Sequence, residues 1–174
     1  MEVGILNIRQ EIITDYDIVY QVTKIAFENA EHSDGNEQDL VVALRKSKSF
    51  IPELSLVAIE DNKIVGHILF TKALVDNVEV LALAPLSVLP EYQKQGIGLS
   101  LIKRGHIIAS NLGYEYSVVL GHAKYYPKAG YIPASKYGIK APFEVNDENF
   151  MAIRFDPKAD KLNGVIQYDK AFGI

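Results

Sequence analysis

The chain contains no cysteine. This absence excludes a disulfide framework, a thiolate zinc site and a cysteine nucleophile, and it fits a reducing compartment, so we expect a cytoplasmic protein. No stretch approaches the ~18 uninterrupted apolar residues of a membrane span. Residues 1–10 lack the basic start and long apolar run of a signal peptide. We therefore expect neither a membrane association nor a cleaved leader.

Charge of one sign is also scarce. The 18 basic and 22 acidic residues give a net charge of −4 and are mixed along the chain, whereas nucleic-acid binders carry a basic excess on one face. We expect no nucleic-acid partner. The 174 residues, 48% hydrophobic, contain no repeat or linker and suit one domain spanning 1–174. The sequence leaves the oligomeric state open, with a homodimer as one possibility.

The first half of the chain predicts two helices and a series of antiparallel strands. Strands are expected over 5–9, 54–60, 63–75 and 78–88, and a helix over 37–46. The dipeptides Asp61-Asn62 and Asp76-Asn77 favour tight turns, so the last three of these strands should form two successive hairpins. Thr14 is the expected N-cap of the first helix, with Ile18, Val22, Ile25 and Ala26 directed inward, and Pro52 is expected to precede the second strand.

The pattern then changes to strand, helix and strand. Apolar residues at helical spacing predict a helix over 96–112, ended by Gly113 and followed by a strand over 116–120. Such a unit places its two strands parallel and close together. A short helix over 123–129 and strands over 150–155 and 165–168 complete a mixed α/β sheet.

A glycine-containing segment, 93–100, connects the fourth strand to this helix. The first N–H groups of a helix lack intrahelical acceptors, and glycines at 96 and 98 allow an anion to approach them. Lys94 adds a positive charge and Ser100 a hydroxyl donor. The alternative is a tight connection with no ligand. The segment is neither a Walker loop nor a dinucleotide fingerprint, because no Gly-Lys-Ser/Thr follows and Leu101 replaces the third glycine.

Three motifs together resemble the GCN5-related N-acetyltransferase (GNAT) family. Residues 93–98, Gln-Lys-Gln-Gly-Ile-Gly, resemble its Gln/Arg-x-x-Gly-x-Gly/Ala motif; residues 86–90 resemble the end of its fourth strand; residues 126–131 resemble its Tyr-x-x-x-Gly-Phe/Tyr element. The resemblance covers about residues 1–132 and is strongest to a bacterial subgroup of N-acetyltransferases. It implies a single-domain fold in which antiparallel hairpins precede a βαβ unit and the central sheet splays at a bulge in the fourth strand.

The resemblance also implies a cofactor site. Acetyl-CoA would pair its pantetheine with the freed strand edge and place its pyrophosphate on the glycine segment. The N–H of Val88 would polarise the thioester carbonyl. Carried over position by position, the cofactor-binding residues are Leu86, Ser87, Val88, Gln93, Lys94, Gln95, Gly96, Ile97, Gly98, Leu99, Ser100, His122 and Tyr125.

Catalysis in this family is direct attack of a neutral amine on the thioester, helped by an acid at the leaving sulfur. Tyr126 matches the position of the family's acid, and the adjacent Tyr125 is the alternative. Glu37 is the candidate base or amine binder, with Glu79 as a second; a first-turn glutamate is also explained by the helix dipole. His122 departs from the family's asparagine and either binds cofactor, acts as a base or caps a helix.

The expected activity is acetyl transfer from acetyl-CoA to a primary amine of a small molecule or a protein. The alternatives are a sensor or partner module that holds acetyl-CoA without turnover, and an enzyme that uses a different acyl donor. No spacing among the four histidines suggests a metal ligand set, so we expect no metal.

Overall fold

A computed structural model of the protein describes residues 5–174. The expectation that the chain has no cleaved leader concerns residues 1–10, of which residues 1–4 lie outside the described residues. The helices are α1 (Tyr16–Phe27), α2 (Glu37–Arg45) and α3 (Ile97–Asn111); the strands are β1 (Asn7–Gln10), β2 (Phe50–Glu60), β3 (Lys63–Val75), β4 (Val78–Val88), β5 (Tyr116–Leu120), β6 (Ile132–Pro133), β7 (Ile139–Lys140), β8 (Phe150–Arg154) and β9 (Gly164–Val165). No helix within the described range is long and apolar enough to cross a membrane.

The two predicted hairpins are confirmed. β2 pairs antiparallel with β3, and β3 with β4. Both connecting dipeptides, Asp61-Asn62 and Asp76-Asn77, have positive φ at both residues, between 48° and 64°. That conformation is the type I′ turn, whose twist matches that of the flanking strands. The turn residues therefore fix the register of the meander.

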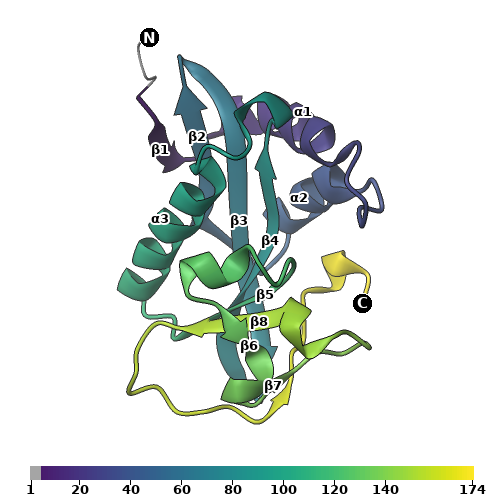
Figure 1. Ribbon diagram of the computed structural model, residues 1–174, viewed down its shortest axis with the longest axis vertical. Helices are drawn as coiled ribbons and strands as arrows, with labels where there is room; N and C mark the ends of the chain where they lie inside the picture. The colour runs from purple at the N-terminus through teal and green to yellow at the C-terminus, as the bar shows by residue number, and fades with distance from the viewer. Residues whose placement is uncertain (1–4) are drawn as a thin grey trace.

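The predicted strand-helix-strand unit is also confirmed. β4 and β5 are adjacent and parallel, and α3 forms the connection between them (Figure 1). The sheet order is β1-β2-β3-β4-β5-β8-β6, and all pairings in this sheet except β4 with β5 are antiparallel. β7 and β9 form a separate parallel pair. The mixed α/β sheet expected from the sequence is therefore present.

Helices cover both faces of the sheet. The Ser87 hydroxyl of β4 lies 3.4 Å from the Thr23 hydroxyl of α1, so α1 covers the face of the sheet to which Ser87 points. α2 packs against α1 on the same face. On the other face, the ring of Phe70 in β3 lies against Gly105 of α3, where an added Cβ would be 2.3 Å from Phe70 Cε2. Figure 1 shows α3 to the left of β3 and β4, and α1 and α2 to their right.

The predicted start of the first helix is wrong, and its predicted inward face is wrong at Ile18 and Ile25 but right at Val22. Residues Ile13–Asp15 form a 3₁₀ turn, so Thr14 is not the N-cap. Asp15 instead accepts the Ile12 N–H at 2.8 Å and pairs with Arg9 at 2.7 Å. The buried stripe contains Val19, Val22 and Thr23, whereas Ile18 and Ile25 are 49% and 42% exposed. Val22 fits either stripe at helical spacing, and only packing against the sheet decides between them.

One proline lies where the sequence did not place it, and another lies in the first turn of a helix that is shorter than predicted. Pro52 lies inside β2, which begins at Phe50; the β2–β3 register shifts between Phe50 and Ser55, so Pro52 has no ladder hydrogen bond to break. Pro127 is the second residue of a 3₁₀ helix, η3 (Tyr126–Ala129), and so lies in a first turn, as a helix in this segment requires; η3 is shorter than the helix expected over 123–129. Its missing N–H costs nothing in a first turn.

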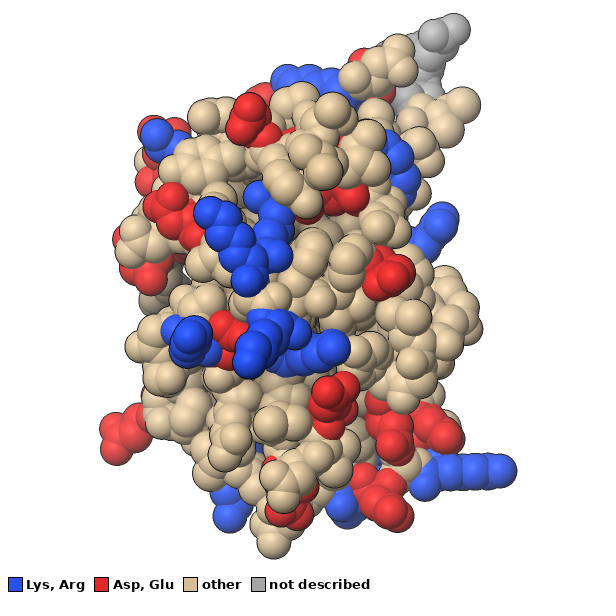
Figure 2. All heavy atoms as spheres, turned by 180° about the vertical axis from the view of Figure 1, so that it is seen from behind, with Lys and Arg blue, Asp and Glu red and all other residues tan. Residues whose placement is uncertain are grey.

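Charges of both signs are mixed on the rear face of the molecule. Figure 2 shows a central group of Lys and Arg side chains on that face, with Asp and Glu side chains around it. On this face, basic and acidic side chains thus lie close to one another.

Candidate active site

The central sheet opens between β4 and β5. These strands pair only at Leu81–Ser117 and Ala82–Val118. Beyond that point β5 continues beside β8, and β4 continues beside β3 as far as Val88. Ile68 lies opposite Leu86 and Phe70 opposite Leu83, so β4 has one extra residue there. This β-bulge bends β4 away from β5, and it confirms the splayed sheet expected from the sequence.

The backbone of β4 offers hydrogen-bonding groups to the opening. Leu89 N–H donates to Val65 C=O of β3 at 2.9 Å. Because successive residues of a strand direct these groups to opposite sides, the N–H groups of Leu86 and Val88 face away from β3. The side-chain amide of Gln93 donates to Val88 C=O at 3.0 Å. The two N–H groups are thus aligned along the opening.

Ser87 does not join them. Its side chain is buried under α1, with the hydroxyl 3.4 Å from Thr23 Oγ1, and alternation directs its backbone groups toward β3. The expectation that Ser87 contacts the cofactor has no support in this geometry.

The glycine segment forms an open helix N-terminus. Lys94 and Gly96 have φ of 62° and 86°, and Gly96 is the N-cap of α3. The first helical bond runs from Ser100 N–H to Gly96 C=O at 3.0 Å, so the N–H groups of Ile97, Gly98 and Leu99 have no intrahelical acceptor. A Cβ at Gly96 would meet nothing within 4 Å. The backbone here fits a pyrophosphate.

Polar side chains of the segment brace the loop itself. Beyond the Gln93 contact, Gln95 Nε2 donates to Glu91 C=O at 3.2 Å and Ser100 Oγ donates to Gly96 C=O at 2.9 Å. The Ser100 hydroxyl is therefore engaged with the helix backbone. Ile97 is buried in the core and Leu99 packs against it, so the segment presents mainly backbone N–H groups and the exposed Lys94.

Three elements meet at Gly98. A Cβ added there would lie 2.2 Å from the Tyr125 hydroxyl and 3.7 Å from Leu86 Cδ2. The first turn of α3, the splayed end of β4 and the residue before η3 therefore converge on one point. A ligand that runs from the helix N-terminus toward the sheet opening would therefore lie next to this point.

Tyr126 directly follows Tyr125 and lies on the side of β5. A Cβ at Gly121 would be 2.4 Å from Tyr126 Cε2, so the ring lies directly on the end of β5. The ring is nearly perpendicular to those of Tyr125 and Tyr131, at centroid distances of 5.1 and 5.8 Å. Burial, with a smaller effect of Tyr125, raises the pKa of the Tyr126 phenol. The group is protonated at neutral pH and can donate a proton.

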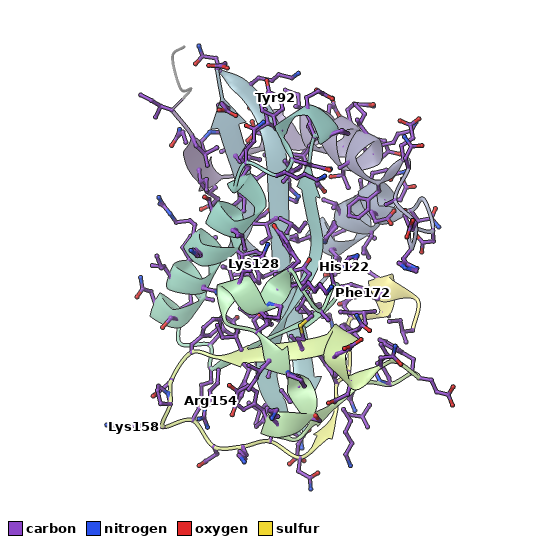
Figure 3. All side chains as sticks on the ribbon, viewed as in Figure 1. Tyr92, His122, Lys128, Arg154, Lys158 and Phe172 are labelled. Atoms are coloured by element: carbon purple, nitrogen blue, oxygen red, sulfur yellow. The ribbon has the colours of Figure 1, made fainter. Side chains whose placement is uncertain are left out.

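His122 begins the turn that contains both tyrosines. Its carbonyl accepts the N–H groups of Tyr125 and Tyr126 at 3.1 and 3.4 Å, and its side chain is exposed. Figure 3 shows it on the connection between β5 and η3, near Phe172 in this view, with Lys128 on η3 itself. Asn149, which sequence reasoning missed, fixes this connection by accepting from Gly121 N–H at 2.9 Å and donating to Gly121 C=O at 3.1 Å.

Glu37 lies apart from the tyrosines. It opens α2, on the face of the sheet opposite α3; its Oε1 accepts from the Ser33 hydroxyl, and its Oε2 is buried without a hydrogen-bond partner among the described residues. None of the contacts in residues 5–174 joins Glu37 to Tyr126. Glu79 is exposed near the start of β4, opposite Leu74 and away from the opening. Within the same residues no group of three His, Asp or Glu side chains is arranged to hold a metal.

Comparison with known proteins decides the family. The sequence model of the acetyltransferase (GNAT) domain matches residues 52–133. A GNAT family acetyltransferase from Brucella melitensis, solved in complex with acetyl-CoA, is 34% identical with a TM-score of 0.81, and the alignment covers 97% of this chain and 98% of that one. The chain belongs to the GNAT acetyltransferase family.

Two Escherichia coli relatives agree with this membership. The uncharacterized N-acetyltransferase YjhQ is 43% identical over 118 residues, just under two thirds of each protein at 65%. The structure of YhbS, solved in complex with CoA, has a TM-score of 0.89 at 24% identity, covers all of this GNAT chain and 95% of its own, and supports the shared fold.

Proposed function

We propose that this GNAT protein binds acetyl-CoA and transfers the acetyl group to a primary amine. The observation that carries the proposal is that the open N-terminus of α3, the splayed end of β4 and Tyr125 converge at Gly98, next to the point where β4 and β5 separate. In this proposal the N–H groups of Ile97, Gly98 and Leu99 hold the pyrophosphate, with Lys94 alongside. The Brucella relative, solved with acetyl-CoA, supports this choice of cosubstrate.

Bound acetyl-CoA supplies an activated acyl carbon, and the chain supplies position and protons. The N–H groups of Leu86 and Val88 donate to carbonyl groups along the opening; one aimed at the thioester oxygen stabilises the charge that develops there. Tyr126 holds its proton on the phenol oxygen and donates it toward the leaving sulfur, which is consistent with its raised pKa. Most of the acceleration comes from holding the amine and the thioester together.

The acceptor enters from the α1 and α2 face of the sheet in this proposal. Glu37 is the proposed amine binder or base on that side, and its unpartnered Oε2 supports the assignment. The acceptor is a small-molecule amine or a protein amine. A single domain over 1–174 and a cytoplasmic location stay predictions from the sequence, and a homodimer stays one possibility for the oligomeric state.

The first experiment is calorimetric titration with acetyl-CoA. One-to-one binding supports the path, and thiol release is then followed with spermidine, a lysine-containing tripeptide and phenylethylamine as probe amines. Release that depends on an amine supports the enzyme. Binding without release from any amine favours a sensor, and no binding at high micromolar acetyl-CoA overturns the site. Titration with succinyl-CoA in competition tests the choice of acyl donor.

The two tyrosines are separated by a matched pair of variants. Tyr126→Phe removes the proposed acid and should lower kcat by about 10²-fold or more, the low end of the usual contribution of acid catalysis, with little change in affinity for acetyl-CoA. Tyr125→Phe removes the hydroxyl beside Gly98 and should mainly change affinity. Full turnover by Tyr126→Phe, together with lost turnover by Tyr125→Phe, would reverse the assignment.

A further inference from the structure

A buried hydrogen-bonded chain lies beneath Tyr126. The hydroxyl of Tyr131 is 3.0 Å from His106 Nε2 and 2.8 Å from Ser117 Oγ. Tyr131 is 1% exposed and Ser117 is fully buried. The three residues come from α3, from β5 and from the segment directly after η3. One hydroxyl therefore joins the helix that begins at the glycine segment to the strand that borders the opening.

The hydroxyl is not needed to fill space. A phenylalanine ring would occupy the same apolar surroundings, where Tyr131 packs against Tyr126 and against His106 at a centroid distance of 5.3 Å. A buried hydroxyl must be hydrogen-bonded to offset its lost hydration, and two partners fix its direction. Burial lowers the pKa of His106 to about 4, so the imidazole is neutral at neutral pH and can accept or donate in this chain.

Tyr131 contacts Tyr126 in two ways. Its N–H donates to the Tyr126 carbonyl at 3.4 Å, and the two rings are nearly perpendicular, with an interplanar angle of 83°. On its other side the Tyr126 ring lies on Gly121. The position of the Tyr126 phenol is thus set by Gly121 and by Tyr131, and the position of Tyr131 is set by His106 and Ser117.

We propose that the Tyr131 hydroxyl, held by His106 and Ser117, is a positioning group that keeps the Tyr126 phenol in its reactive place. The inference rests on the proposed function, because it assigns to Tyr131 a role that acts through the acid Tyr126. It goes beyond that function by giving α3 two tasks: its N-terminus faces the cofactor path, and its third turn fixes the catalytic turn. Displacement of a catalytic group by about 1 Å can cost about 10²-fold in rate.

The test is a double-mutant cycle between Tyr131→Phe and Tyr126→Phe. Thiol release is followed with acetyl-CoA and whichever of the three probe amines is fastest, and acetyl-CoA affinity is measured by calorimetry. Tyr131→Phe alone should lower kcat about tenfold, because we expect it to displace the Tyr126 phenol by less than about 1 Å. The KM for acetyl-CoA should change less than twofold. In the Tyr126→Phe background the same change should lower kcat less than twofold, since its effect is exerted through Tyr126.

Tyr116→Phe is the matched control. Tyr116 is also 1% exposed, and its hydroxyl donates to Asp160 C=O at 2.6 Å, away from the opening. This variant loses a part-buried hydrogen bond to a backbone carbonyl, so it should lose some stability while keeping kcat. Ser117→Ala removes one partner without changing the Tyr131 ring and should lower kcat in the same direction, which keeps the test decisive if Tyr131→Phe folds poorly.

The outcomes separate the two levels of the argument. Equal fold-losses for Tyr131→Phe in both backgrounds, or unchanged kcat in both Tyr131→Phe and Ser117→Ala, overturn the positioning role alone. No thiol release from the unaltered chain, or full kcat in Tyr126→Phe, overturns the proposed acid and this inference with it. A tenfold loss that vanishes in the Tyr126→Phe background supports both.

Discussion

Replacement of Gly98 by alanine is the sharpest test of the proposed cofactor path. Gly98 is buried in the first turn of α3, and its φ is not in the left-handed region, so alanine fits the backbone. The added methyl group would lie 2.2 Å from the Tyr125 hydroxyl, and the next neighbours are Tyr125 Cζ at 3.5 Å and Leu86 Cδ2 at 3.7 Å. Only the hydroxyl is too close, so Tyr125→Phe should remove the conflict.

The stability change combines two opposing terms. Glycine to alanine in a helix gains about 0.5–1 kcal/mol. Displacement of the Tyr125 hydroxyl by more than an ångström forces an off-rotamer side chain, which costs of order 0.5–1.5 kcal/mol. Gly98→Ala alone should therefore change the free energy of unfolding by less than about 1 kcal/mol, whereas Gly98→Ala in the Tyr125→Phe background should gain the full helix term. Urea unfolding measures both.

Affinity should behave differently from stability. The alanine methyl group stays in the ligand's path whichever residue is at 125, so Gly98→Ala should weaken acetyl-CoA binding at least tenfold in either background, which is about 1.4 kcal/mol. Calorimetric titration of the four proteins gives the comparison. If Gly98→Ala/Tyr125→Phe binds as tightly as Tyr125→Phe, position 98 does not contact the ligand, and the reasoning about the path is refuted.

Three further predictions concern the site and the buried charges. Gly121→Ala would place a Cβ 2.4 Å from Tyr126 Cε2 and should lower kcat while leaving acetyl-CoA affinity within twofold. Steady-state kinetics measures kcat and calorimetry the affinity, and a kcat equal to that of the unaltered chain contradicts the prediction. Burial lowers the pKa of His67 to about 4, so between about pH 6.5 and 4 the unfolded chain binds a proton that the folded chain does not. The free energy of unfolding therefore falls as pH falls through that window, by about 2 kcal/mol from pH 7 to 5 for this group. Thermal unfolding of His67→Gln should show a correspondingly smaller fall, and parallel stability curves for the two proteins would refute the lowered pKa of His67. Glu11→Ala leaves Arg45 buried and unpaired at a pair whose side chains are 1% and 8% exposed. It should cost about 3–5 kcal/mol in urea unfolding, and an unchanged urea midpoint would contradict it.

The sequence predicted the parts of the fold that depend on neighbouring residues. The Asp61-Asn62 and Asp76-Asn77 turns fixed both hairpins because a type I′ turn needs positive φ at both residues, which asparagine and aspartate tolerate. The βαβ unit followed from a change in periodicity. The inward face of α1 did not follow, because isoleucines at 18 and 25 and valines at 19 and 22 give overlapping helical stripes, and the sheet that selects one stripe is distant in sequence.

The candidate site was predictable where it consists of backbone. The motif spacing placed the glycine segment at the end of β4 and the N-terminus of α3, as observed. The side chains were less predictable: Gln95 and Ser100 carry donors suited to a phosphate, yet both donate to carbonyl groups of their own loop. The links from Tyr131 to His106 and Ser117 join residues 25 and 14 positions apart, and nothing in a single sequence signals such a contact.

The adjacent tyrosines show how the structure adds to the sequence. Either phenol could serve as the acid on sequence grounds, since both stand before the Gly130-Tyr131 pair. The turn after His122 sends them to different elements: the Tyr125 hydroxyl lies against Gly98 in α3, whereas the Tyr126 ring lies on Gly121 at the end of β5. A residue beside the helix N-terminus is placed to contact the cofactor, and one at the strand end, where the sheet splays, is placed beside the reacting bond. The Tyr126 side also carries the buried support from Tyr131, His106 and Ser117, whereas Tyr125 has no comparable network in residues 5–174. A proton donor needs rigid support, because the rate of proton transfer depends more strongly on the donor's position than cofactor binding does. This difference favours Tyr126 as the acid.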